Sequence, residues 1–215
     1  MTRDHSAQWI ERTGLIAIVR LERAPELVKV AKAIAAGGVS VIEFTLTTPG
    51  ALRTIEESTR ELGDQVLIGA GTVLDGETAR AAILAGAEFV VAPTLNLDVI
   101  EICHRYDKLV VPGAYTPTEI LTAWEHGADF VKVFPAEIGG PAYLKAVRAP
   151  LPQVKMIPVG GVSLETAEAF LRAGAVALGV GSNLVDRKAV AEGRLEQLTA
   201  SALALSQVVR KAKGS

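Results

Sequence analysis

The sequence is poor in cysteine and in long apolar runs. Cys103 is the single cysteine among 215 residues, so no disulfide can form within the chain, and a reducing environment is expected. Charged residues and prolines interrupt every apolar stretch before it is long enough to cross a bilayer. Residues 1–14 are polar and charged and lack the apolar centre of a signal peptide. We therefore expect a cytoplasmic protein that does not act in a membrane.

Histidine is also scarce, and neither sign of charge dominates. The three histidines, His5, His104 and His126, are far apart in sequence, so no metal site is expected from them, although a site of carboxylates alone stays open. The net charge is −2, and no basic stripe of the kind that binds nucleic acid is present. The composition argues against a nucleic-acid partner and leaves room for a small anion bound at a local site.

What the chain does have is apolar residues in short runs. It is 49% hydrophobic and 21% charged, which suits one sizeable folded core. Eight of these runs are expected to be strands. They are continuous rather than alternating, as in parallel strands that are covered on both faces. The runs are residues 15–19, 39–45, 65–70, 88–92, 108–112, 129–134, 154–159 and 175–180.

Helix-like segments separate the strand-like runs. Several end in a glycine, which readily takes the left-handed conformation that stops a helix. Thr116 and Glu119 have the spacing of a capping box at a helix start. The last segment, residues 189–213, is expected to form one long helix. The clearest of the other helical segments are residues 24–38, 49–63, 75–87, 116–128 and 163–175.

This alternation predicts an α/β fold, a single (β/α)₈ TIM barrel, near the short end of that fold's size range. The expected domain spans residues 1–215, with an N-terminal helix and a long C-terminal helix, because no linker divides the chain. An open doubly wound sheet is the alternative. The absence of a G-x-G-x-x-G sequence after the first strand weakens that alternative.

In such a barrel, functional side chains gather at the carboxyl ends of the strands. Lys132 lies in the apolar run "DFVKVFP", deep in the sixth expected strand. Lys108 and Lys155 instead begin strands and should face the opposite end. A buried amine has a lowered pKa and can act as a nucleophile, but a structural ion pair would explain the same position.

Glu43 is a carboxylate inside a second apolar run, "VIEFTL". Burying a carboxylate without a role is costly. One carboxylate near the amine of Lys132 could transfer the protons that Schiff-base chemistry requires. It could equally be the ion-pair partner of Lys132, and the two roles are compatible because both require the side chains to meet.

Two glycine-serine loops follow the seventh and eighth expected strands, "VGGVS" at 159–163 and "GVGSN" at 179–183. Glycine lets backbone N–H groups approach an anion, and barrels often bind phosphate at this place. Tight turns that need glycine are the simpler explanation. Arg20, at the end of the first strand, could supply a cation to a phosphate or to a substrate carboxylate.

Seven sequence blocks, taken together and in order, resemble the class I 2-keto-3-deoxy-6-phosphogluconate (KDPG) aldolases. The resemblance runs from about Gly14 to Val185, and "FVKVFPAE" and "GAGTVL" are its most specific blocks. The other blocks are "VIEFTLTTPGAL", "VAPTLN", "VPGAYTPTE", "IPVGGV" and "GSNLV".

The resemblance implies a lyase that cleaves a keto-acid phosphate reversibly to pyruvate and glyceraldehyde 3-phosphate, as in the Entner–Doudoroff pathway. It implies a homotrimer of (β/α)₈ barrels with no metal and no cofactor. Lys132 would form the Schiff base, and Glu43 would be the general acid and base. Substrate binding would fall to Thr72 and Pro93 at the pyruvate end, Phe134 beside the lysine, and Gly160, Gly161 and Ser182 at the phosphate.

Two positions depart from the KDPG aldolase pattern. Many of these aldolases have an arginine for the substrate carboxylate where this chain has Thr47, so Arg20 or backbone N–H groups near Thr72 would have to replace it. Many have a threonine where this chain has Val159. Relatives that prefer the C4 epimer, the 6-phosphogalactonate acid, resemble this chain in having valine there. The epimer preference therefore stays open, and 4-hydroxy-2-oxoglutarate is a further substrate of the family.

Two other functions remain as alternatives. A phosphate-binding barrel isomerase or epimerase would have the glycine loops but would not need Lys132. A ligand-binding barrel without activity would not need to retain both Lys132 and Glu43.

Overall fold

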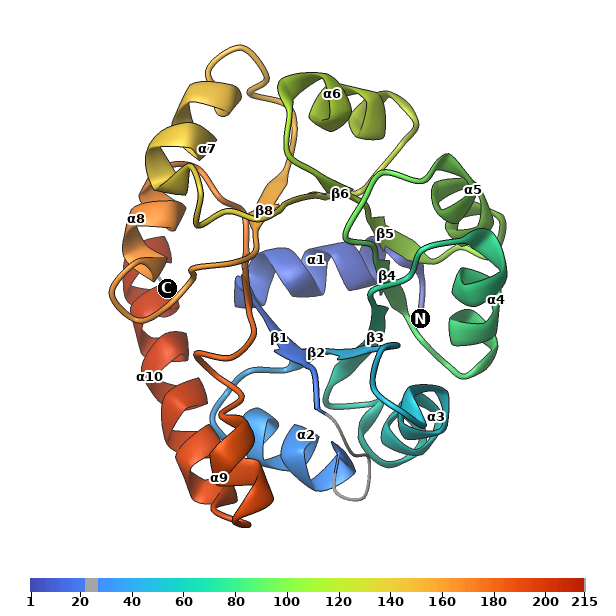
Figure 1. Ribbon diagram of the computed structural model, residues 1–215, viewed down its shortest axis with the longest axis vertical. Coiled ribbons are helices and arrows are strands. Elements are labelled where there is room, and N and C mark those ends of the chain that lie inside the picture. Colours follow the sequence, from blue (N-terminus) through green and yellow to red (C-terminus); the bar gives the residue numbers. More distant parts are fainter. Residues whose placement is uncertain (22–26, 215) are drawn as a thin grey trace.

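The computed structural model describes residues 1–21 and 27–214 and shows a ring of parallel strands surrounded by helices (Figure 1). Within the described residues the strands pair in the order β5-β4-β3-β2-β1-β9 and β6-β7-β8, and every pairing is parallel. The strands are β1 (Leu15–Val19), β2 (Val41–Thr45), β3 (Leu67–Gly71), β4 (Phe89–Val91), β5 (Leu109–Val111), β6 (Gly113–Ala114), β7 (Val131–Val133), β8 (Met156–Pro158) and β9 (Leu178–Val180).

Each of the eight predicted runs contains a strand. The fifth run continues past Pro112 into β6, and Pro112 separates β5 from β6 because proline has no N–H for a strand ladder. A bridge between Val159 and Gly179 joins β8 to β9 and links the two groups of strands. The prediction of a (β/α)₈ barrel is therefore confirmed, with one strand in two pieces.

The helices alternate with the strands and cover the outside of the ring (Figure 1). Thr116 and Glu119 form the expected capping box at the start of α6. Part of the predicted helix 24–38, residues 24–26, lies outside the described residues. The helices are α1 (Arg3–Thr13), α2 (Leu27–Ala36), α3 (Ala51–Leu62), α4 (Gly76–Leu84), α5 (Leu97–Arg105), α6 (Pro117–Glu125), α7 (Gly140–Arg148), α8 (Ala167–Arg172), α9 (Arg187–Ala191) and α10 (Leu195–Lys213).

The prediction of one continuous helix over residues 189–213 is wrong. The segment begins inside α9, breaks, and continues as α10. Gly193 takes a φ of 71°, and the Arg194 N–H donates to the Ala189 carbonyl, which closes the end of α9. A glycine in this conformation ends a helix at little cost, and the sequence reading missed it.

The helix α1 lies across the amino-terminal end of the barrel. Trp9 and Ile10 of this helix pack with inward-facing side chains from the starts of the strands, such as Phe89 and Phe130. Lys155, predicted to face this end, pairs with Glu11 of α1 at 2.6 Å, and Lys108 pairs with Glu88 at 2.7 Å. These contacts leave the carboxyl ends of the strands as the end at which a site can form.

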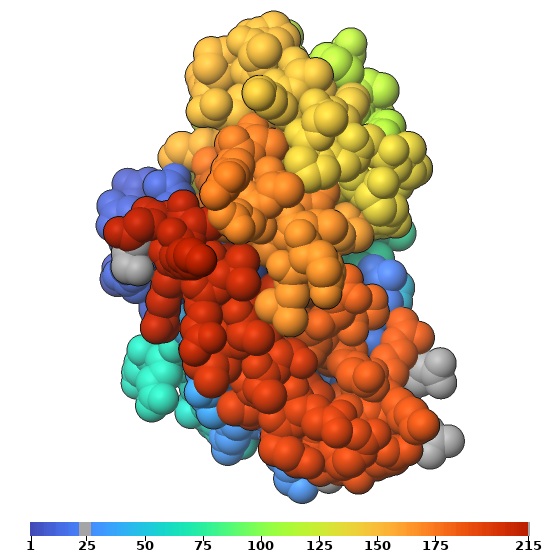
Figure 2. Space-filling model, turned by 90° about the vertical axis from the view of Figure 1, so that its left-hand side faces the viewer, coloured from blue at the N-terminus to red at the C-terminus, as the bar shows by residue number. Residues whose placement is uncertain are grey.

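The helix α10 closes the outer layer. It packs against α2 and α8 and runs along the face seen in Figure 2. Buried Leu198, Ala202 and Leu205 face the second, larger apolar core, which fills the space between strands and helices. Thr199 Oγ1 donates to the Ala33 carbonyl of α2 at 2.8 Å.

Candidate active site at the carboxyl ends of the strands

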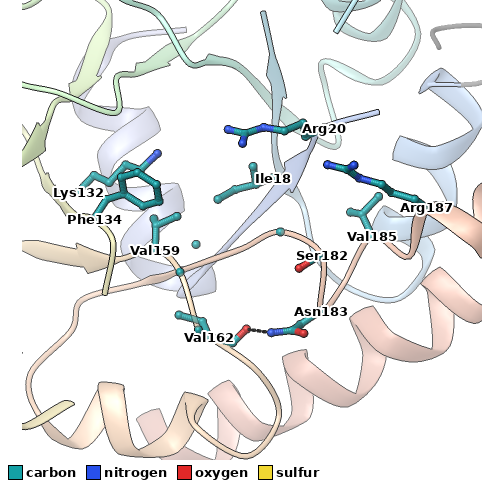
Figure 3. A pocket seen from close by; sticks show the side chains of 14 residues that line it. Ile18, Arg20, Lys132, Phe134, Val159, Val162, Ser182, Asn183, Val185 and Arg187 are labelled. Atoms are coloured by element: carbon teal, nitrogen blue, oxygen red, sulfur yellow. Dashed lines mark hydrogen bonds between the residues drawn. The ribbon is translucent and has the colours of Figure 1, made fainter. Parts of the chain in front are cut away.

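A cavity of about 200 Å³ opens at the carboxyl end of the barrel (Figure 3). Its walls come from the ends of β1, β7, β8 and β9 and from the loops that follow them. Six of the ten predicted site residues line it: Arg20, Lys132, Phe134, Gly160, Gly161 and Ser182. The strand that carries the lysine and the two glycine loops therefore share one space, as the sequence predicted.

Lys132 is the central residue of β7 and is only 4% exposed. Its Nζ atom lies 4.8 Å from the centre of the Phe134 ring, beside the cavity. Burial lowers the pKa of the Lys132 amine, and the charge of Arg20 lowers it further, while Glu43 acts in the opposite direction. The net direction favours the neutral amine, which is the nucleophilic form.

Glu43 is the central residue of β2 and is 2% exposed. It lies below the main cavity, where Glu43 and Lys132 line a small void of about 10 Å³ that shares Ile18, Val159 and Gly179 with the main cavity. Burial raises the pKa of the Glu43 carboxyl, although the positive charges of Lys132 and Arg20 partly offset the effect. Glu43 is therefore poised to carry a proton.

Within the described residues no hydrogen bond or salt bridge joins Glu43 to Lys132, although each affects the pKa of the other. Burial favours the uncharged forms of both groups. A neutral amine and a neutral carboxyl together hold the same number of protons as an ammonium and a carboxylate. One proton moved from amine to carboxyl therefore produces a nucleophile and an acid in the same step.

Arg20 follows β1 and extends into the mouth of the barrel (Figure 3). Its Nη2 atom donates to Thr72 Oγ1 at 3.2 Å, which brings the guanidinium to the end of β3. Thr72 has a φ of 60°, a left-handed conformation that is uncommon for a residue other than glycine and marks local strain. Arg20 is thus close enough to influence both Glu43 and Lys132.

Thr72 does not line the cavity itself but accepts a hydrogen bond from Arg20, which does. Two other predicted residues, Thr47 and Pro93, also do not line the cavity. Thr47 Oγ1 donates to Thr45 Oγ1 at 3.3 Å within the turn after β2. The backbone of Pro93 packs against Gly113 of β6. Both residues follow strands at the correct end of the barrel, but neither lines the cavity. The Thr47 side chain therefore does not reach the cavity in this structure.

The loop after β8 needs its glycines for conformation and for space. Gly160 and Gly161 have φ values of 98° and 68°, and a Cβ at either would overlap the side chain of Glu137. The loop after β9 is held to it, because Asn183 Nδ2 donates to the Val162 carbonyl at 2.8 Å. The glycine loops thus form one connected cradle.

The lining residues that sequence reasoning missed include Asn183, Val185 and Arg187. Asn183 directly follows the predicted Ser182, so its position next to a phosphate loop was available as a hint. Arg187 begins α9 and belongs to no recognised block, so nothing in the sequence distinguished it from a solvent-facing arginine.

Other parts of the described chain offer less chemistry. No group of three or more histidine, cysteine, aspartate or glutamate side chains in residues 1–21 and 27–214 is arranged to hold a metal ion. Burial raises the pKa of the Cys103 thiol to about 12, so it is not a reactive thiolate at neutral pH. No helix in these residues has the length and apolar character that a membrane span requires.

The site therefore combines a buried amine, a buried carboxyl and a connected glycine cradle at one end of a barrel. Comparison with known proteins agrees with this chemistry. The model of the family "KDPG and KHG aldolase" matches residues 7–201. The chain is 37% identical over 201 residues to 2-dehydro-3-deoxy-phosphogluconate aldolase of Treponema pallidum, covering 93% of this chain and 95% of the relative.

A relative named for the C4 epimer, the 6-phosphogalactonate acid, is almost as similar in sequence. The chain is 34% identical to 2-dehydro-3-deoxy-6-phosphogalactonate aldolase of Escherichia coli K12, covering 94% of this chain and all of the relative. Among solved structures, KDPG aldolase of Legionella pneumophila, with pyruvate captured as a covalent carbinolamine, superposes with a TM-score of 0.87 at 28% identity, covering 93% of this chain and 97% of that one. The chain belongs to the KDPG and KHG aldolase family, whose members are lyases.

Proposed function

We propose that the chain reversibly cleaves 2-keto-3-deoxy-6-phosphogluconate to pyruvate and glyceraldehyde 3-phosphate through a Schiff base on Lys132. The observation that carries the proposal is the buried Lys132 amine with Glu43 beneath a cradle of glycines. Burial supports an unprotonated nucleophile at Lys132 and a proton donor at Glu43.

The first half of the reaction forms the imine. The neutral amine of Lys132 attacks the ketone carbon of the substrate, and the Glu43 carboxyl donates a proton to the carbonyl oxygen. Proton transfers through Glu43 then release that oxygen as water and leave a protonated imine. The positive nitrogen at C2 can accept the electron pair of the C3–C4 bond, which lies one carbon away.

The second half breaks that bond. The Glu43 carboxylate takes the proton of the C4 hydroxyl, the C3–C4 bond breaks, and its electron pair becomes the double bond of an enamine. Glyceraldehyde 3-phosphate leaves as the aldehyde. Glu43 returns a proton to the enamine carbon, and water adds to the imine to release pyruvate and free Lys132.

The cradle supports the binding of phosphate. Gly160, Gly161 and Ser182 line the cavity, and the hydrogen bond from Asn183 to the Val162 carbonyl joins the two loops. Arg20 supports binding of the substrate carboxylate, because it lies at the mouth beside Thr72 and affects both Lys132 and Glu43. Phe134 packs beside the reacting amine. Thr72 and Pro93, which we propose contact pyruvate, do not line the cavity.

The 6-phosphogalactonate epimer is a second candidate substrate. Val159 lines the cavity and presents only methyl groups there, so it offers no hydrogen bond to a substrate hydroxyl. The similarity to the Escherichia coli phosphogalactonate aldolase adds support. Cleavage rates on the two epimers, measured for the natural chain and for Val159→Thr, decide between them. A shift toward the gluconate epimer in Val159→Thr would assign the selectivity to this position.

Trapping of an intermediate tests the central proposal. The chain is incubated with pyruvate, reduced with borohydride, digested and mapped by peptide mass spectrometry. We expect the pyruvyl adduct on Lys132, with Lys108 and Lys155 serving as internal controls at the opposite end of the barrel. An adduct confined to the controls, or no adduct at all, would favour an isomerase or a ligand-binding barrel.

We also propose that the chain acts in the cytoplasm as a homotrimer. A structure titled as a cage designed by fusing symmetric oligomeric domains is 33% identical and superposes with a TM-score of 0.86, which supports an oligomer. Light scattering on the purified chain tests the assembly. A molar mass three times that of the 22.6 kDa chain is expected, and a mass equal to one chain would contradict it.

A further inference from the structure

The charged side chains that line the cavity in the described part of the chain are all basic, although the Glu137 carboxylate lies next to Gly160 of the cradle. Among the described residues that line the cavity, Arg20, Lys132 and Arg187 are basic, and none is acidic. Glu43 lies below, in the smaller void. The guanidinium groups of Arg20 and Arg187 stay charged and face this common space, so they repel each other, and an anionic ligand removes that repulsion. The arrangement favours a ligand with more than one negative group.

Arg187 is the cation for which the proposed reaction has no role so far. It is the first residue of α9, and its side chain is exposed. No salt bridge joins it to the adjacent Asp186 in the described residues, and the Asp186 carboxylate accepts from the Ala189 N–H at 2.8 Å. The nearby Glu192 pairs instead with Arg194. In the described part of the chain Arg187 has no ion pair or hydrogen bond of its own.

The backbone that carries Arg187 is fixed by the cradle itself. The N–H groups of Leu184 and Val185 both donate to the Gly181 carbonyl at 2.9 Å, which forms a tight turn between Ser182 and α9. Val185 is 3% exposed and anchors this turn in the core. Arg187 therefore starts from a well-defined position beside the predicted phosphate site.

The two arginines lie at different parts of the cavity. Figure 3 shows Arg20 between Lys132 and Arg187, with Ser182 below the two guanidinium groups. Arg20 is tied to Thr72 and acts on the charges of Lys132 and Glu43. Arg187 lies at the far side from Lys132, with Ser182 and Val185. One cation thus belongs to the reacting end and the other to the distal end.

We propose that Arg187 binds the distal phosphate of the substrate and sets the preference for phosphorylated over unphosphorylated keto acids. The inference rests on the proposed aldolase function and names a specificity residue for it. Backbone N–H groups and the Ser182 hydroxyl carry no full charge, whereas a guanidinium fits two phosphate oxygens at once and stays charged at every working pH.

The test compares Arg187→Gln with Lys188→Gln. Both substitutions remove one positive charge from consecutive residues of α9, but Lys188 does not line the cavity. Each variant is assayed for cleavage of 2-keto-3-deoxy-6-phosphogluconate and of the same acid without phosphate. For Arg187→Gln we expect KM for the phosphorylated acid to rise about 10- to 100-fold, the range for a lost hydrogen bond to a charged group. Its kcat/KM on the unphosphorylated acid should stay within about twofold of the natural chain's.

The same variants are also tested for inhibition by inorganic phosphate. We expect a raised inhibition constant in Arg187→Gln and no change in Lys188→Gln. Arg187→Lys, which keeps the charge but loses the planar fork, should fall between the natural chain and Arg187→Gln. Equal losses on both substrates in Arg187→Gln would give it a structural role, and unchanged kinetics would show that it does not contact the phosphate.

Failure of the proposed function can be distinguished from failure of this inference. If the natural chain neither cleaves the substrates nor forms a pyruvate adduct, the aldolase proposal fails. Direct binding of inorganic phosphate, measured by calorimetry on the natural chain and on Arg187→Gln, still tests Arg187. Weaker binding in the variant supports the inference, and equal or absent binding in both overturns it.

Discussion

Gly71 of β3 leaves the space that the Glu43 carboxylate of β2 occupies. A Cβ built on Gly71 would overlap Oε1 of Glu43. The neighbouring Gly69 makes room in the same way for the Phe89 ring of β4, closer to the amino-terminal end of the barrel. A glycine inside a strand often marks such a close approach. The position of Glu43 thus depends on a residue that has no side chain.

Gly71→Ala should therefore displace the carboxylate. We expect a loss of roughly 1–3 kcal/mol of unfolding free energy from overpacking, and a fall in kcat because Glu43 no longer reaches the reacting atoms. Thermal unfolding and steady-state kinetics provide the two measurements. Gly69→Ala is the matched control, since it overpacks the same strand against Phe89 and leaves the carboxylate in place. If both variants keep the kcat of the natural chain, then Gly71 does not set the position of Glu43.

Lys132→Met should abolish turnover and borohydride trapping while the fold persists. Methionine keeps the length of the side chain and removes an amine whose charged form is disfavoured by burial. We expect a melting temperature that is equal to or higher than that of the natural chain. Residual cleavage at near-normal rates would exclude Lys132 from the reaction, and a large drop in melting temperature would assign it a structural role.

Glu43→Gln should slow proton transfer by roughly 10²–10⁴-fold and leave pyruvate able to bind. It should also change the pH dependence of adduct formation. The Glu43 carboxylate raises the pKa of Lys132, so its removal lowers that pKa further. The neutral amine then forms at lower pH, and the rising limb of the trapping rate should move to lower pH. A limb that moves to higher pH would contradict this coupling.

Arg20→Met should move the same limb in the opposite direction. The Arg20 guanidinium lowers the pKa of the Lys132 amine, so its removal raises that pKa. The neutral, nucleophilic amine then forms only at higher pH. We also expect weaker binding of pyruvate, since the variant lacks a cation for the carboxylate. Trapping rates measured across pH at several pyruvate concentrations separate the two effects. An unmoved limb would place Arg20 too far from Lys132 to influence it.

Asn183→Ala should loosen the cradle. It removes the hydrogen bond from Asn183 to the Val162 carbonyl, worth about 1 kcal/mol of stability, and should raise KM for phosphorylated substrate more than for unphosphorylated substrate. Asn96→Ala is the control, because its amide makes a comparable bond to the Leu74 carbonyl outside the cavity. Similar KM values for both variants would mean that the loops hold their places without this bond.

The features predicted correctly from the sequence are those that carry a visible energetic cost. Charged residues inside apolar runs are rare because burial is expensive, and this singled out Lys132 and Glu43, whose side chains line one small void. Continuous apolar runs indicated parallel strands, and their number and order indicated a closed barrel. The two glycine loops were found because their conformation restricts residue choice, as the positive φ values of Gly160 and Gly161 show.

The features missed were those without such a cost. The sequence could not say which way a side chain points at a strand end, and Thr47 and Pro93 do not line the cavity, so their roles stay predictions. Arg187 reads as an ordinary exposed arginine, because only the tertiary fold brings α9 beside Ser182. Gly193 lies within a periodic apolar pattern, so its role as a helix stop became visible only in the backbone.

The helix α1, which packs across the amino-terminal end of the barrel, also bears on how substrate reaches the site in the proposed reaction. With that end covered, substrate reaches the buried Lys132 through the cavity at the other end, past the glycine loops. A phosphorylated aldehyde seated in the cradle then lies between a lysine-bound pyruvate and solvent. In the proposed cleavage the aldehyde departs first because pyruvate is still bound to Lys132 as an enamine, and in synthesis pyruvate binds first for the same reason. Among the described residues, α1 covers one end of the barrel, so both partners use the cavity at the other end.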